Sequence, residues 1–109
     1  MNIAVLLGGI SPERNISMLS GRAIVKALRA RGHTVVPIDP ALGANGTLTD
    51  ADLDLATNAP VEQSILSGYQ PKNLLECVAS GQLAGRDLAF IALHGRYEED
   101  GYMQSLLDL

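Results

Sequence analysis

Three short apolar runs divide the chain into segments with strand character and segments with helix character. The runs cover residues 2–7, 33–39 and 87–93, and the first of them ends abruptly at Gly8-Gly9. Short apolar runs that are bounded by turn residues are typical of strands buried on both faces of a sheet. We therefore predict three buried strands, with helices in the longer segments between them.

The segment after the first strand has the period of an amphipathic helix. Basic residues fall between apolar residues at three- and four-residue steps over residues 15–31, and Gly32 follows as a stop signal. The cap at the start of this helix can be Ser11, Asn15 or Ser17, and the pattern leaves the three open. The predicted apolar face consists of Ile16, Leu19, Ala23, Ala27 and either Leu28 or Ala30.

The remaining segments are less periodic. Residues 71–81 have the pattern of a second helix that begins near Pro71, and residues 102–109 begin another helix. Residues 41–70 are rich in Gly, Asn, Asp, Thr and Pro. We predict that this segment is mostly irregular, with one short element near residues 61–66.

Strands that alternate with helices favour a parallel sheet with right-handed crossover connections. The predicted fold is therefore α/β, a three-layer arrangement in which helices cover both faces of a parallel sheet. In such sheets, ligands bind at the carboxyl ends of the strands. Two polar loops follow strand ends here, "GGISPER" at residues 8–14 and "HGRYEEDG" at residues 94–101. Both loops should open at the same edge of the sheet.

Composition and charge limit the classes of protein to which this chain can belong. The chain has 109 residues, of which 47% are hydrophobic, and corresponds to about one domain. No apolar run reaches the roughly 18 residues of a membrane span. Cys77 is the single cysteine, which fits a small buried side chain in the reducing cytoplasm. Basic residues concentrate in residues 1–38 without interleaved aromatic residues, so we interpret them as a solvated helix face and expect no nucleic-acid binding.

The first polar loop combines a permissive backbone with a carboxylate. Gly8-Gly9 allows a sharp turn and a close approach by a ligand, and the following helix directs unpaired N–H groups at the same place. This pattern fits either a ligand-binding loop or a tight strand–helix turn. Glu13 can receive a cationic group such as an amine, or it can simply complement the helix dipole.

The second polar loop carries a histidine and an acidic cluster. His94 follows a buried strand, where it is either a packed, hydrogen-bonded side chain or a catalytic group. Glu98, Glu99 and Asp100 form either a charged loop or part of a metal site. Because no second set of ligands accompanies these acids, we predict no metal site in this chain.

Taken together, the two loops indicate a protein family more specifically than either loop does alone. The stretch "AVLLGGISPERNISMLSGRAIVKALRARGHTVVPID" resembles the opening of D-alanine–D-alanine ligases, where a Gly-Gly loop leads into S-x-E-R-x-x-S and an "SG" pair in the helix. The stretch "FIALHGRYEEDGYMQSLLDL" is similar to their second signature, H-G-x-x-G-E-D-G-x-x-Q-G-x-L-E. The match covers roughly residues 3–39 and 88–109, and residues 41–86 are not diagnostic.

The resemblance implies a Rossmann-like pre-ATP-grasp domain and a longer parent enzyme, of which residues 1–109 are the N-terminal substrate-binding domain. In that family, ATP phosphorylates one D-alanine on its carboxylate, and the amine of a second D-alanine attacks the acylphosphate to give the dipeptide for peptidoglycan. ATP and Mg²⁺ or Mn²⁺ would bind in ATP-grasp domains without a counterpart here, so this segment alone should be inactive. The resemblance also implies a cytoplasmic, homodimeric parent.

The resemblance assigns roles to four residues by position. Glu13 would hold the ammonium of the first D-alanine, and His94 would lie near the carboxylate of that substrate. Ile16 would line the same site, and Glu99 would help to organise the closing loop. These roles agree with the chemistry of a zwitterion, which needs an anionic partner for its amine and a polar or cationic partner for its carboxylate.

The chain departs from the family pattern at four positions. Glu98 replaces the first glycine of G-E-D-G, and a bulky residue there changes the loop if that glycine has a positive φ. Tyr97 stands where small residues are common, Ser105 where glycine is usual, and Asn15 where glutamate is common. The choice among D-alanine, D-lactate and D-serine as second substrate stays open.

A second hypothesis belongs to another class of protein, a free-standing flavodoxin-like module that binds a small anionic ligand. A receiver-type module would need an acidic cluster after its first strand, and Gly8-Gly9 stands there instead. The two hypotheses differ in whether the polypeptide continues into ATP-grasp domains.

Overall fold

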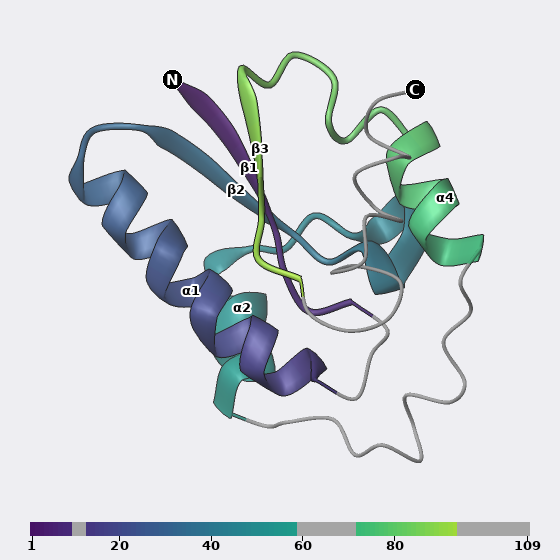
Figure 1. Cartoon of the computed structure of the whole chain (residues 1–109), viewed down its shortest axis with the longest axis horizontal. Coiled ribbons are helices and arrows are strands. Elements are labelled where there is room, and N and C mark those ends of the chain that lie inside the picture. Colours follow the sequence, from purple (N-terminus) through teal and green to yellow (C-terminus); the bar gives the residue numbers. More distant parts are fainter. Residues whose placement is uncertain (10–12, 59–71, 94–109) are drawn as a thin grey trace.

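Three parallel strands form a single sheet in a computed structural model that describes residues 1–9, 13–58 and 72–93. The strands lie in the order β2-β1-β3, with the first strand at the centre (Figure 1). The α/β fold that the sequence predicts is therefore confirmed. The elements in chain order are β1 (Asn2–Leu6), α1 (Arg14–Ala30), β2 (Thr34–Ile38), the 3₁₀ helix η1 (Pro40–Asn45), α2 (Asp50–Asn58), α4 (Lys72–Ala79) and β3 (Leu88–Ile91).

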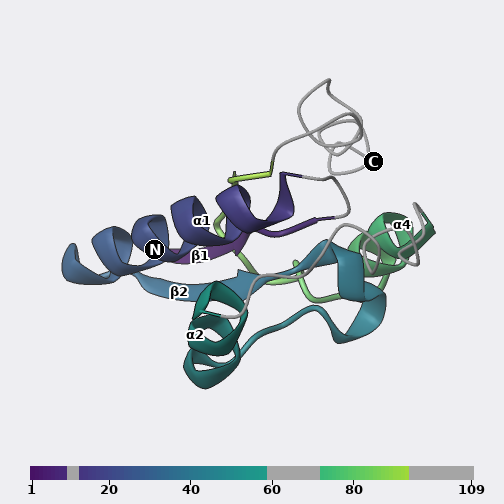
Figure 2. The same cartoon turned by 90° about the horizontal axis from the view of Figure 1, so that it is seen from below.

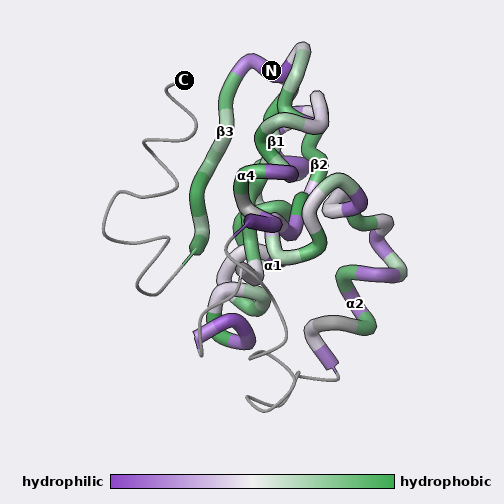
Figure 3. The backbone as a smooth tube through the Cα atoms, turned by 90° about the vertical axis from the view of Figure 1, so that its right-hand side faces the viewer, coloured by the Kyte–Doolittle hydropathy of each residue, from purple (hydrophilic) through white to green (hydrophobic). Residues whose placement is uncertain are grey.

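The central strand β1 is the most deeply buried element. Each residue from Ile3 to Leu7 is at most 2% exposed. Neighbouring strands occupy both edges of β1 and helices cover both of its faces, which explains its continuous apolar run in place of an alternating pattern. Figure 3 shows the three strands as largely apolar segments.

Helices cover both faces of the sheet, as the sequence predicts. In Figure 1, α1 and α2 lie on one side of the strands and α4 on the other, and α4 stays apart from them in Figure 2. Successive side chains of β1 point to opposite faces and so contribute to two cores. The first core consists of Ile3, Val5, Leu7, Met18, Val25, Val35, Leu53 and Ala92. The second consists of Ala4, Leu6, Ile38, Cys77 and Leu93.

The buried face of α1 differs from the predicted one. Ile16 and Leu19, two residues of the predicted apolar face, are each 58% exposed. The prediction was wrong because apolar residues occur around the whole helix, and hydrophobicity alone could not select the face. The residues that are buried against the sheet are Arg14, Ser17, Met18, Gly21 and Val25.

The ends of α1 agree with the prediction to within one residue. The helix begins at Arg14 with Glu13 at the N-cap position, where the Glu13 side chain makes no cap hydrogen bond. Asn15 and Ser17 lie inside the helix, so neither is its cap, and Ser11 lies outside the described residues. Beyond the C-terminal end, Gly32 adopts a φ of 87°, as expected for a glycine stop signal.

The prediction of a mostly irregular segment at residues 41–70 was wrong for its first part, which forms η1 and α2. A reciprocal cap starts α2. The N–H of Asp52 donates to Oγ1 of Thr49 at 3.1 Å, and the N–H of Thr49 donates to the Asp52 carboxylate at 3.2 Å. This capping box satisfies helix N–H groups in a segment of weak hydrophobic periodicity. The short element expected at 61–66 lies outside the described residues.

Two ion pairs join α2 to α1. Arg22 contacts Asp54 at 2.8 Å, and Arg29 contacts Asp50 at 2.9 Å. The interpretation of the basic face as simply solvated was therefore wrong for these two arginines.

Among the helices of the described segments, none is long and apolar enough to cross a membrane.

The contact between Gly21 and β1 leads to a test of the core. A Cβ atom at Gly21 would lie 2.5 Å from Cβ of Leu7. We expect Gly21→Ala to lower the free energy of unfolding by about 1–3 kcal/mol, because overpacking outweighs the gain of about 1 kcal/mol in helix propensity. Urea unfolding measures this change. Ser20→Ala, on the same helix, is the control and should change stability by less than about 0.5 kcal/mol. A stabilised Gly21→Ala variant would contradict the expectation.

Candidate functional site

The strands that precede the two polar loops end side by side. Leu6 and Ile91 are paired at the carboxyl ends of β1 and β3. Beyond this pair, the N–H of Ala92 donates to the carbonyl of Leu6 at 2.8 Å. The strand ends that precede the two loops therefore lie at one edge of the sheet, whereas the second loop, residues 94–101, lies outside the described residues. His94 and Glu99 lie outside the described residues, so their proposed roles stay predictions.

Gly8 and Gly9 form a turn that only glycines adopt readily. Their φ angles are 79° and 81°, in the left-handed region. The N–H of Gly8 donates to Oγ of Ser17 at 2.9 Å, and the N–H of Gly9 donates to Oδ1 of Asp39 at 3.1 Å. Gly8 and Gly9 therefore turn sharply after β1, which is compatible with both alternatives, a ligand-binding loop and a tight strand–helix turn.

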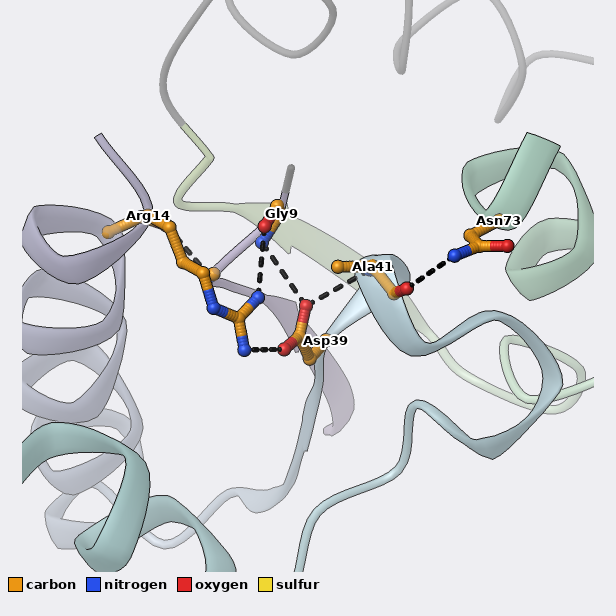
Figure 4. A network of polar contacts seen from close by, with 7 residues as sticks. Gly9, Arg14, Asp39, Ala41 and Asn73 are labelled. Carbon is orange, nitrogen blue, oxygen red and sulfur yellow. Dashed lines mark hydrogen bonds and ion pairs between the residues drawn. The ribbon is translucent and has the colours of Figure 1, made fainter. Parts of the chain in front are cut away.

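A buried ion pair lies directly beneath this turn. Nη2 of Arg14 contacts Oδ2 of Asp39 at 2.5 Å, and the two side chains are 6% and 0% exposed. Nη1 of Arg14 donates to the carbonyl of Gly9 at 2.9 Å. Figure 4 shows the guanidinium of Arg14 and the N–H of Gly9 converging on Asp39. The pair thereby joins the first residue of α1, the turn after β1 and the end of β2.

The hydrogen bonds of Asp39 continue toward the opposite face of the sheet. Oδ1 of Asp39 also accepts from the N–H of Ala41 at 3.0 Å. The carbonyl of Ala41 accepts in turn from Nδ2 of Asn73 in α4 at 2.8 Å (Figure 4). A single polar network therefore connects helices that cover opposite faces.

Sequence reasoning missed the role of Arg14, which it grouped with the exposed basic residues. Two signals were present. Arg14 directly follows Glu13 inside the S-x-E-R-x-x-S segment, and Asp39 is an acid at the end of a strand predicted to be buried. A buried carboxylate needs a cationic or hydrogen-bonding partner, so these two residues could have been paired.

Ser17 joins the same turn to β3. Its hydroxyl accepts from the N–H of Gly8 and donates to the carbonyl of Ala92. Ser17 is completely buried. Ala92 lies two residues before His94, so this hydroxyl connects the start of one polar loop to the strand that leads into the other.

Glu13 and Ile16, the two predicted site residues within the described part, lie at the start of α1. The carbonyl of Glu13 accepts from the N–H of Ser17 at 3.0 Å. Both Glu13 and Ile16 are exposed, and positions three residues apart are neighbours on a helix surface. The carboxylate and the apolar side chain are therefore presented together at the surface.

A cavity of about 340 Å³ opens beside the ion pair. Glu13 and Ile16 do not line it, so this cavity and the surface at Glu13 are different places. The lining residues are Arg14, Met18, Asp39, Leu42, Asn45, Thr47, Leu48 and Asp52.

The described residues do not supply a metal site. Across residues 1–9, 13–58 and 72–93, no group of three or more His, Cys, Asp or Glu side chains is placed to hold an ion.

Cys77 is buried against the sheet, as predicted, at 1% exposure. Burial raises the pKa of its thiol from 9.0 to about 11, with a smaller contribution from the negative charge of Asp39. A thiol with this pKa remains protonated at neutral pH and is a poor nucleophile. Cys77 therefore acts as a small core residue.

Comparison with known proteins identifies similar sequences over almost the whole chain. Residues 2–109 match the family model described as D-ala D-ala ligase N-terminus. The chain is 40% identical over 106 residues to a D-alanine–D-alanine ligase of Cupriavidus metallidurans, which covers 97% of this chain and 22% of that protein. Ligases of the same name from Gluconobacter oxydans and Halalkalibacterium halodurans are 37% and 38% identical, over 99% and 100% of this chain and 26% and 25% of those proteins. The chain thus spans about a quarter of the length of these relatives.

The raised pKa of Cys77 predicts a loss of stability in alkali. The folded state holds the thiol proton more tightly than the unfolded state, so this contribution is complete below pH 9 and is lost as the pH rises toward 11. We expect the urea midpoint to fall more steeply over this range than in Cys77→Ala, which lacks the thiol. Unfolding curves at several pH values measure the difference, and parallel pH profiles for the two proteins would contradict it.

Proposed function

Because this chain belongs to the D-ala D-ala ligase N-terminus family, we propose that it is the N-terminal substrate-binding domain of an ATP-dependent D-alanine–D-alanine ligase. The observation that carries the proposal is the family match over residues 2–109. The adjacent strand ends of β1 and β3 support it, since they start the two loops that bear the matching motifs. The family match does not support the alternative of a free-standing flavodoxin-like module.

Glu13 is proposed to bind the ammonium of the first D-alanine. Glu13 stands at the N-terminus of α1, where the helix dipole is positive and disfavours an ammonium. A carboxylate at this position reverses the local charge and accepts charge-assisted hydrogen bonds from the amine. The same positive helix end favours the carboxylate of the zwitterion, so Glu13 determines which end of the substrate approaches.

The other proposed site residues complete the first substrate site. Ile16 offers an exposed apolar side chain one turn from Glu13. His94 is proposed to lie near the substrate carboxylate, and Glu99 to organise the closing loop; the support for both is the motif in the sequence. In the proposed reaction, ATP would activate the carboxylate of D-alanine. We assign the binding sites for ATP and for Mg²⁺ or Mn²⁺ to the part of the relatives that this chain does not cover.

The proposal extends to the parent protein. Its product would be D-alanyl-D-alanine for peptidoglycan synthesis, and the support is the name shared by the relatives. We propose a cytoplasmic homodimer for the full-length enzyme. The single free cysteine supports the cytoplasmic assignment, because a reducing compartment keeps thiols unpaired.

The role of Glu13 is tested by Glu13→Gln in the full-length ligase. Glutamine keeps the size and one acceptor oxygen but removes the charge. A charge-assisted hydrogen bond is worth about 1.5–3 kcal/mol, so kcat/KM for the first D-alanine should fall roughly ten- to a hundredfold. Steady-state kinetics should show little change in KM for ATP.

Glu76→Gln provides the matched control for this variant. It is the same substitution at an exposed position of α4, on the opposite side of the sheet from α1, and its kinetics should equal those of the unmodified enzyme. If Glu13→Gln also leaves the D-alanine kinetics unaltered, Glu13 only complements the helix dipole and the site assignment is wrong.

The assignment of the nucleotide site to other domains of the enzyme is tested with residues 1–109 alone. We expect this segment neither to hydrolyse ATP nor to form the dipeptide, because the nucleotide site is assigned to other domains. D-alanine should bind weakly, since a few contacts to a small ligand hardly offset the cost of association. Release of phosphate that depends on D-alanine, measured with the pure segment, would overturn this assignment.

A further inference from the structure

The polar groups of the Gly8-Gly9 turn are bound by side chains from α1 and from the residue that follows β2. Ser17 accepts from the N–H of Gly8, and Asp39 accepts from the N–H of Gly9. Arg14 donates to the carbonyl of Gly9. The shape of this turn is therefore determined by three side chains that the proposed substrate site does not itself use.

The turn and the ion pair fit closely against each other. A Cβ atom at Gly8 would lie 2.9 Å from Oδ1 of Asp39 and 3.0 Å from Nη1 of Arg14. A side chain at this position would clash with the pair, so only glycine fits there. The backbone of the turn cannot move away without losing buried hydrogen bonds, and an unsatisfied buried polar group is costly. The pair therefore fixes the position of the turn from one side.

Arg14 is also the covalent neighbour of Glu13. Its guanidinium uses one nitrogen for Asp39 and another for Gly9, which fixes the orientation of the side chain as well as its position. A lysine retains the positive charge, but it cannot reproduce this planar two-point contact. The anchoring of Arg14 thus limits the movement of the residue that carries the proposed ammonium-binding carboxylate.

Ser17 extends this constraint to the second loop. The hydroxyl bonds to Gly8 and to Ala92 at once, so it reinforces the backbone hydrogen bond from Ala92 to Leu6 that already joins the ends of β1 and β3. The loops that carry Glu13 and His94 begin at these two ends.

We propose that Arg14, Ser17 and Asp39 are positioning residues that hold the Gly8-Gly9 turn and the start of α1, which carries Glu13, in a fixed place beside the end of β3. The inference rests on the proposed function for the identity of the substrate. That these residues fix the turn follows from the hydrogen bonds alone, whatever the substrate is. Arg14, Ser17 and Asp39 act through Glu13 and the end of β3 and do not contact the substrate.

The holding of the turn is tested by hydrogen exchange in the full-length protein. The peptide over residues 4–9 contains the N–H groups of Gly8 and Gly9, which should exchange slowly in the unmodified protein. Ser17→Ala and Arg14→Lys should each accelerate this exchange by about tenfold or more, because local opening becomes easier. Ser20→Ala makes the same chemical change as Ser17→Ala one turn away, and it should leave the exchange of this peptide unaltered.

The effect on the substrate is tested by kinetics of the same variants at a temperature where circular dichroism shows all of them folded. A small displacement of a binding group lowers the reaction rate by up to about a hundredfold. We therefore expect kcat/KM for the first D-alanine to fall roughly ten- to a hundredfold. KM for ATP should remain that of the unmodified enzyme. Ser20→Ala should retain the kinetics of the unmodified enzyme.

The outcomes distinguish the inference from the proposed function. Unchanged exchange in Ser17→Ala and Arg14→Lys overturns the inference, whatever the activity. Faster exchange with unaltered D-alanine kinetics in an active enzyme also overturns it, because the three residues would then only stabilise the fold. If the unmodified full-length protein does not use D-alanine but exchange is accelerated as expected, the proposed function fails and the positioning of the turn is upheld.

Discussion

The ion pair between Arg14 and Asp39 is the constraint on which the site end of the molecule depends. Removing two charges from water costs several kcal/mol for each ion, and close geometry with additional hydrogen bonds must offset this cost. Asp39 meets the requirement with Arg14 and two backbone N–H groups, and Arg14 meets it with Asp39 and the carbonyl of Gly9. Each of these partners must keep its place, so the pair specifies the path of the chain around it.

Such a pair contributes more to geometry than to stability. Buried ion pairs are often no more stabilising than apolar residues of the same volume, although the loss of one partner is costly. Here the cost falls on the place where three segments meet: the turn after β1, the start of α1 and the end of β2. The apolar cores on the two faces of the sheet stabilise the layers, whereas the polar contacts align the strand ends relative to one another.

The sequence predicted the parts of the fold that depend on local pattern. The three strands and both ends of α1 follow from apolar runs and glycine signals, and the structure places them within one to two residues. The prediction that the third strand is buried was wrong for one face of β3, where Leu88 and Phe90 are 47% and 41% exposed at the edge of the described sheet. The face of α1 could not be predicted, because Arg14, Ser17 and Gly21 are buried for close packing and hydrogen bonding and not for hydrophobicity. The helix α2 has few apolar residues, so only the capping box of Thr49 and Asp52 marks its start. Motifs in the sequence suggested Glu13 as a site residue, but the ion pair beside it was not predicted, because it joins residues 25 positions apart.

The central place of β1 in the sheet has a consequence for the synthesis of the protein. Asn2 contacts Asp87, which lies 85 positions later in the chain. At about 5–20 residues per second, a ribosome needs roughly 4 to 17 seconds to extend the chain between these two positions. One edge of β1, the most apolar strand, therefore remains unpaired until β3 has left the exit tunnel. Nascent chains of this topology are exposed to aggregation during that interval, and chaperones that bind short apolar segments would find β1 available.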